Sequence, residues 1–226
     1  MYHSPEFPAD HFNSLITSLI LSSFLSKKTY GYDISDNMIA LAKKKYNNVT
    51  FTTKFDEIEI YKYDVITSFC VFHLIPNPVS VLEKLYNLLY DNGLLFLVIP
   101  ICNNPNFIKS RDETIKKYSN LFKIPVSQQN NSIMREQSSI KTTLIEIGFI
   151  DIDISNYQCR NPFYDKKNLV SWCVGTLSAN WNIPFEHSFN FFTDLVERYI
   201  ELRPTEQDSD GFVHLEWEYI YVVARK

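Results

Sequence analysis

The stretch from residue 29 to residue 99 alternates β-rich runs with helical patterns, and this alternation constrains the fold more than any other feature of the sequence. Apolar runs of four to eight residues are typical of buried strands, whereas apolar positions three or four apart indicate helices. In chain order, the expected elements are strand 29–35, helix 36–45, strand 49–53, strand 63–69, helix 78–90 and strand 94–99. Strands that alternate with helices need right-handed crossovers, so the sequence predicts an α/β fold with a parallel, doubly wound sheet.

Three segments within this stretch resemble the class I S-adenosylmethionine-dependent methyltransferases. They read YGYDIS from Tyr30, YDVITSFCVFHLIPN from Tyr63 and LLYDNGLLFLVIP from Leu88, in the order and spacing of that family. Within it, the chain is most similar to the juvenile hormone acid methyltransferase-like group, because of YNLL from Tyr86 and the ending YIYVVARK from Tyr219. The resemblance implies a Rossmann-like sheet, S-adenosylmethionine as cofactor, and O-methylation of a small-molecule carboxylic acid or hydroxyl.

The family pattern also contains a hydrophobic first strand and a glycine-rich loop, and the sequence has neither before Gly31, the first of its five glycines. Pro5 and Pro8 cannot donate hydrogen bonds to a central ladder, so residues 1–10 are not expected to form the strand. A helix over 15–24 is expected instead. We therefore expect a chain truncated before the loop, a sheet of about six strands and an incomplete cofactor site. A partial chain and a paralogue that has lost the loop both fit this pattern.

The resemblance places the cofactor contacts at strand ends. Asp33 follows the second strand of the family pattern, where an acid can accept hydrogen bonds from both ribose hydroxyls; a solvated turn acid is the alternative. Ile34 is expected against the adenine, with plain packing as the alternative. Asp56 loosely matches the acid near the adenine amino group, with a solvated loop as the alternative. Ser68 and Phe69 end the expected strand 63–69, which is the fourth strand of the family pattern. They lie at the edge where open α/β sheets bind ligands.

His73 is the candidate catalytic residue, because it resembles the family's histidine near the methyl acceptor. It could donate a hydrogen bond to a carboxylate or act as a base for a hydroxyl. A structural histidine packed among Phe72, Leu74 and Ile75 is the alternative. Transfer to a carboxylate needs no base because the sulfonium is already activated, so correct positioning and exclusion of water matter more than a catalytic signature.

The sequence after residue 100 predicts further helices and two strands. The expected elements are helices 107–118, 133–147, 166–177 and 184–202 and strands 149–154 and 212–225. The last two helices are expected to form a cap inserted at about 158–211 within one methyltransferase-like domain, 1–226. Its aromatic residues either line an apolar acceptor pocket or fill the core. They are Trp172, Trp181, Phe189, Phe191 and Phe192.

Composition narrows the class of partner. The net charge of −4 has no basic stripe, which argues against nucleic acid and anionic membranes. Cys70, Cys102, Cys159 and Cys173 lack metal-site or disulfide spacing, so reduced thiols, no bound metal and a cytoplasmic location are expected. The apolar stretch at 15–25 is shorter than the roughly 20 residues of a membrane span.

Two functions from different classes fit these observations. The first is a methyltransferase that acts on a small molecule, such as a lipid-like acid. The second is a non-catalytic methyltransferase-like protein whose cleft binds an apolar ligand or a protein partner. The missing glycine loop favours the second, whereas an upstream segment that supplied the loop would favour the first.

Overall fold

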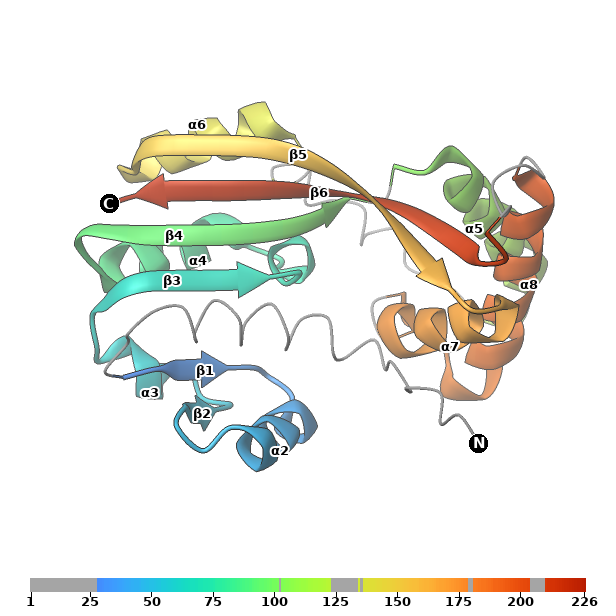
Figure 1. Ribbon diagram of the computed structural model, residues 1–226, viewed down its shortest axis with the longest axis horizontal. Helices are drawn as coiled ribbons and strands as arrows, with labels where there is room; N and C mark the ends of the chain where they lie inside the picture. Colours follow the sequence, from blue (N-terminus) through green and yellow to red (C-terminus); the bar gives the residue numbers. More distant parts are fainter. Residues whose placement is uncertain (1–27, 102, 123–133, 135, 179–180, 204–209) are drawn as a thin grey trace.

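The computed structural model describes residues 28–101, 103–122, 134, 136–178, 181–203 and 210–226, which form a mixed α/β fold (Figure 1). The elements in chain order are β1 (Tyr30–Tyr32), α2 (Asp36–Lys45), β2 (Thr50–Thr52), α3 (Asp56–Glu59), β3 (Tyr63–Phe69), the 3-10 turn η1 (Phe72–Leu74), α4 (Pro78–Leu88), β4 (Leu89–Ile101), α5 (Pro105–Tyr118), α6 (Gln137–Ile147), β5 (Ile150–Phe163), α7 (Lys166–Leu177), α8 (Phe185–Leu202) and β6 (Val213–Arg225). The α/β class predicted from the sequence is confirmed. The predictions for 1–10 and 15–24 lie outside the described residues.

A small parallel sheet joins β1 to β2, with Tyr30 opposite Thr50 and Tyr32 opposite Thr52. The crossover between the two strands is α2. Ser35 caps its first turn, because the Ser35 hydroxyl accepts a hydrogen bond from the Met38 amide at 3.3 Å. This strand–helix–strand unit places residues 33–35 at the carboxyl end of β1.

The larger sheet has the strand order β3-β4-β6-β5. β3 and β4 run parallel, with Ile66 opposite Leu95 and Phe69 opposite Val98. β6 lies inside the sheet and runs antiparallel to both β4 and β5. Figure 1 shows the arrows of β1, β3 and β4 pointing the same way, so all three carboxyl ends face the same side of the molecule.

The two sheets meet through side chains instead of a backbone ladder. Within the described part of the chain, β1 pairs with β2 alone and β3 with β4 alone. Tyr30 stacks on Tyr61 with ring centroids 4.8 Å apart, and it meets the edge of Tyr63 at 5.8 Å. Aromatic packing thus joins the sheets where a shared strand would otherwise do so.

A long antiparallel hairpin dominates the second half of the chain. β5 and β6 pair from Ile150 and Arg225 at one end to Phe163 and Val213 at the other. The sequence predicted a strand only as far as Ile154, but β5 continues because β6 offers hydrogen-bond partners along its whole length. In Figure 1 the hairpin leaves the sheet, twists, and reaches the group formed by α5, α7 and α8.

Two hydrophobic cores lie along this hairpin. The first packs α4 and α6 against the sheet and includes Leu82, Leu95, Leu97, Ile140, Leu144 and Val222. The second packs α5, α7 and α8 together and includes Phe107, Leu169, Phe191, Phe192, Leu195 and Leu215. β6 contributes Val222 to the first core and Leu215 to the second. The helical group, which we call the cap, is therefore anchored to a central strand of the sheet.

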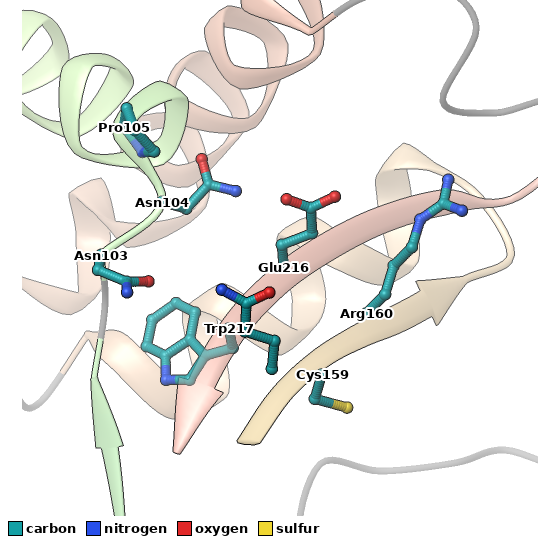
Figure 2. A pocket seen from close by; sticks show the side chains of 8 residues that line it. Asn103, Asn104, Pro105, Cys159, Arg160, Glu216 and Trp217 are labelled. Atoms are coloured by element: carbon teal, nitrogen blue, oxygen red, sulfur yellow. The ribbon is translucent and has the colours of Figure 1, made fainter. Parts of the chain in front are cut away.

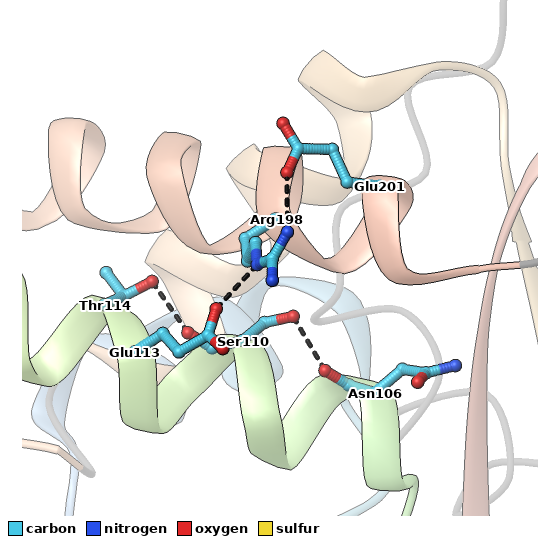
Figure 3. A network of polar contacts seen from close by, with 6 residues as sticks. All are labelled: Asn106, Ser110, Glu113, Thr114, Arg198 and Glu201. Atoms are coloured by element: carbon cyan, nitrogen blue, oxygen red, sulfur yellow. Dashed lines mark hydrogen bonds and ion pairs between the residues drawn. The ribbon is translucent and has the colours of Figure 1, made fainter.

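The outer surface of the cap carries a polar network between α5 and α8 (Figure 3). Arg198 on α8 donates a hydrogen bond to Glu113 on α5 at 2.6 Å and another to Glu201 at 3.0 Å. Along α5, the Ser110 and Thr114 hydroxyls donate to backbone carbonyls one turn earlier. α5 thus belongs to the cap in space, although its sequence lies far from α7 and α8.

Candidate active site

Asp33 lies at the carboxyl end of β1, as the sequence predicted. Its Oδ1 atom accepts a hydrogen bond from the Ser35 amide at 2.8 Å, and its own amide bonds weakly to the Thr52 carbonyl at 3.4 Å. Its Oδ2 atom has no hydrogen-bond partner among the described residues. Since Ser35 caps α2, Asp33 is not needed for that purpose. One carboxylate oxygen fixes the side chain, and the other remains available to a ligand.

Ile34 extends next to Asp33 with 82% of its surface exposed. An isolated exposed apolar residue is ordinary, but this one adjoins a second apolar group, in which the Tyr32 ring meets the edge of Phe55 at 5.2 Å. Asp56 is exposed at the start of α3, immediately after Phe55. The structure thus places Ile34 and Asp56 on segments that follow the two paired strands β1 and β2.

Ser68 and Phe69 end β3 and are half-buried. Phe69 meets the edge of Phe96 at 5.8 Å, and the chain then turns at Cys70, whose φ of 55° lies in the left-handed region. The Cys70 amide donates to the Val98 carbonyl at 2.8 Å, which fixes this turn to β4. Burial raises the pKa of the Cys70 thiol to about 11, so the thiol is protonated at neutral pH.

His73 lies in η1, between buried Phe72 and exposed Leu74, and is itself half-buried. The turn follows β3 at the same edge of the sheet as the Ser68–Phe69 strand end. His73 therefore lies at the carboxyl edge of the sheet. Its partial burial beside Phe72 also fits the alternative role in packing.

A pocket of about 450 Å³ opens beyond the carboxyl end of β4, between the sheet and the cap (Figure 2). It is lined by Asn103, Asn104, Pro105, Gln158, Cys159, Arg160, Glu216 and Trp217. The first three residues lead into α5 and the others lie on the β5–β6 hairpin. Sequence reasoning missed this pocket because only the register of the hairpin brings residues near 160 and 216 together.

The aromatic residues of the cap divide between the two predicted roles. Phe191 and Phe192 are fully buried, and Trp172 and Trp181 pack against the same core. Phe189 is exposed instead. Filling of the core therefore accounts for four of these five aromatic residues, and the pocket has Trp217 as its large aromatic side chain.

Metal and membrane functions find no support in the described ranges. Their side chains include no group of three or more His, Cys, Asp or Glu placed to bind a metal ion. None of their helices combines the length and hydropathy that a membrane span needs. Cys70, Cys159 and Cys173 form no disulfide bond within the described part of the chain.

Comparison with known families gives one match, to the methyltransferase domain, over residues 13–95. This range contains the first two segments that suggested the resemblance and the part of the third segment up to residue 95. The match is to a methyltransferase domain and covers little more than a third of the chain. The grouping with juvenile hormone acid methyltransferases stays a prediction, and a search of curated proteins gave no match.

Solved structures support the same fold. A proposed methyltransferase of Bacillus halodurans shares 16% identity with this chain, with a TM-score of 0.57 over 96% of this chain and 90% of that one. The YcgJ protein of Bacillus subtilis gives 14% identity and a TM-score of 0.55 over 93% and 87%. These similarities show that the chain shares the α/β fold of the two solved proteins.

Proposed function

We propose that the carboxyl ends of β1 and β3 form a binding site for S-adenosylmethionine. The proposed reaction of this site is O-methylation of a small-molecule carboxylic acid or hydroxyl. The observation that carries this proposal is the Asp33 carboxylate, which is fixed at Oδ1 by the Ser35 amide and unpartnered at Oδ2 among the described residues. An oriented acid of this kind suits the two ribose hydroxyls.

The neighbouring residues fit the rest of an adenosine moiety. Ile34 offers an exposed apolar side chain to the adenine, and Asp56 offers an acceptor to its amino group from the start of α3. Ser68 and Phe69 bound the same edge from β3. The cofactor, when bound, supplies an activated methyl group; the residues of this chain orient it and exclude water.

His73 is proposed to face the acceptor. As a neutral imidazole, it would orient a substrate hydroxyl or remove its proton, and as a donor it would hold a carboxylate. Transfer to a carboxylate requires no proton removal, so replacement of His73 should affect a hydroxyl substrate more than a carboxylate. This difference makes the two substrate classes separable by experiment.

The adenosine half of the site is better equipped than the methionine half. In the family, a glycine-rich turn contacts the methionine part through its backbone, and this sequence has no glycine before Gly31. Contacts to one half of a ligand cannot reach the affinity of the whole or hold the methyl group in line for transfer. We therefore expect weak cofactor binding and no turnover of farnesoic-type or other fatty acids by the 226-residue chain.

Isothermal titration with S-adenosylmethionine and S-adenosylhomocysteine tests cofactor binding directly. A radiolabelled methyl-transfer assay should compare this chain with a version extended upstream by a hydrophobic strand and an Asp-x-Gly-x-Gly loop. Weak binding by the first and tighter binding with turnover by the second would support the proposal. Robust turnover by the 226-residue chain would show that the site is complete without the loop.

A non-catalytic role is the second candidate, and the interruption between β1 and β3 favours it. Within the described ranges these strands share no hydrogen bonds, so the two sides of the cofactor edge are not held by one ladder. A protein that binds an apolar ligand or a partner protein would tolerate this arrangement. No cofactor binding by either version of the chain would favour the second candidate.

A further inference from the structure

The pocket between the sheet and the cap is lined by one acidic side chain, that of Glu216. Glu216 lies on β6 directly opposite Arg160 on β5, yet its side chain forms no hydrogen bond or ion pair with a described residue. Figure 2 shows the Glu216 carboxylate turned toward Asn104, across the pocket from the end of β4. Glu216 is exposed to solvent at this pocket, so its carboxylate is accessible to a cation from solution.

The neighbouring acid behaves differently. Glu218, two residues along β6, accepts hydrogen bonds from the side-chain amides of Asn103 and Asn156, and the Asn156 side chain is held in turn by Gln137. Glu218 is thus occupied by protein donors. Glu216 lies opposite Arg160 of β5, whereas Glu218 lies opposite Gln158. This stretch of the hairpin therefore carries two carboxylates and one guanidinium, a balance that favours a positively charged ligand.

An aromatic wall stands beside these acids. Trp217 forms T-shaped contacts with Phe107 on α5 and Trp172 on α7, with ring centroids 5.7 Å and 6.1 Å apart. These contacts lock the indole between the hairpin and the cap. An indole is the best of the aromatic side chains for attracting an ammonium group to its face, particularly where water is partly excluded.

We propose that this pocket binds an ammonium group of the methyl acceptor, with Glu216 as counter-ion and Trp217 as the aromatic wall. The acceptor would then be a small molecule that carries both a positively charged amine and the hydroxyl or carboxyl group to be methylated. This inference rests on the proposed methyl transfer for the role of the ligand, but it does not require it for binding of the ammonium group.

The position of the pocket suits such an acceptor. Phe69, at the end of β3, is opposite Val98 on β4, and the same strand continues to Ile101, opposite Glu218. Tyr219 is near both Cys70 and Cys159, since both thiols, after burial, raise the pKa of its hydroxyl. Tyr219 therefore connects the β3 edge, where the cofactor is expected, to the pocket where the amine is expected.

The test uses choline as the probe and its neutral isostere 3,3-dimethylbutan-1-ol as the ligand control. Both are titrated calorimetrically into the 226-residue chain without cofactor. Choline should bind at least about tenfold more tightly than the isostere, because the two differ in charge and not in shape. Equal affinity, or no binding of choline, would overturn the inference.

Matched variants locate the site. Glu216→Gln should weaken choline binding by about tenfold or more, and Trp217→Leu should also weaken it. Glu146→Gln on α6, an exposed glutamate outside the pocket, should leave binding unchanged. Circular dichroism and a urea titration verify folding of each variant. Choline binding that survives Glu216→Gln would contradict the assignment even if Trp217→Leu fails to fold.

The result is separable from the proposed function. Choline binding that depends on Glu216, together with no S-adenosylmethionine binding, would support the ammonium site and contradict methyl transfer. Cofactor binding that depends on Asp33, together with no choline binding, would do the reverse.

Discussion

The hydroxyl of Tyr199 on α8 donates a hydrogen bond to the backbone carbonyl of His214 on β6, with 3.0 Å between the oxygens. Both residues are buried, so no water replaces this bond if the hydroxyl is removed. The bond joins the longest cap helix to the central strand of the sheet. It is a direct connection between the two parts of the fold that border the pocket.

Tyr199→Phe should therefore destabilise the protein by about 1 to 3 kcal/mol, the usual cost of leaving a buried carbonyl unsatisfied. The free energy of unfolding is measured by urea titration followed by circular dichroism. Tyr164→Phe, at an exposed tyrosine, is the control and should change stability by less than about 0.5 kcal/mol. Equal effects of the two substitutions would show that the Tyr199 bond contributes nothing.

Removal of the negative charge at Asp33 should affect cofactor binding and not folding. Asp33→Asn is expected to weaken any S-adenosylmethionine binding by about 1 to 3 kcal/mol, because charge-assisted hydrogen bonds to the ribose are lost. Calorimetric titration provides the affinity. Asp64→Asn, at an exposed position near the amino end of β3, should leave it unchanged. Unaltered affinity in Asp33→Asn would exclude this residue from the site.

Truncation of a cap phenylalanine should cost far more when the residue is buried. Phe191→Ala should lower the free energy of unfolding by about 3 to 5 kcal/mol, because it opens a cavity in the second core. Phe185→Ala on the same helix is the control, since Phe185 is 91% exposed. Similar small losses for both variants would mean that the cap core is not packed as described.

The Cys70 thiol should react slowly at neutral pH. Its pKa, raised by burial to about 11, leaves less thiolate than an ordinary cysteine has, and the thiolate is the reactive form. Alkylation by iodoacetamide, followed peptide by peptide in a mass spectrometer, should be at least about a hundredfold slower than in the urea-unfolded chain at pH 8. The rate should increase up to about pH 11. Rapid alkylation of the folded protein at pH 7 would refute this.

The Arg198–Glu113 pair should stabilise the cap at neutral pH and not in acid. The hydrogen bond from Arg198 lowers the pKa of Glu113, so the stabilisation is complete above the unfolded-state pKa of glutamate. It is lost as the pH falls through the lower, folded-state pKa. Arg198→Ala should therefore reduce the urea midpoint at pH 7 and reduce it less in acid. Lys141→Ala on α6 is the control, and a pH-independent loss would implicate packing instead of charge.

Local signals predicted much of the fold because they act within a few residues. Ser35 caps α2, and Gly148 ends α6 with a φ of 113°, a conformation that glycine adopts without strain. The helix predicted over 166–177 has those bounds in the structure. Asp33 and Ser68 lie at strand ends for the same reason: their positions follow from the strands that precede them.

The remainder depends on pairing between distant segments. Beyond Ile154, β5 loses the alternation of apolar and polar residues, so its length is set by β6 and not by its own pattern. The same register brings Arg160 opposite Glu216 and creates the pocket. The packing of α5 on α8 is likewise a contact between residues that lie about 80 positions apart, such as Glu113 and Arg198. Such contacts have no local signature.

Two helices of the cap, α7 and α8, are inserted between β5 and β6, and β6 is an interior strand. A change in the segment from Phe163 to Val213 that displaced β6 would therefore disturb its pairing with both β4 and β5. A module appended at an end of the chain could be exchanged without that cost. Divergence of ligand preference in relatives with this hairpin should accordingly proceed by substitution of individual pocket side chains, with the spacing between the two strands kept nearly constant.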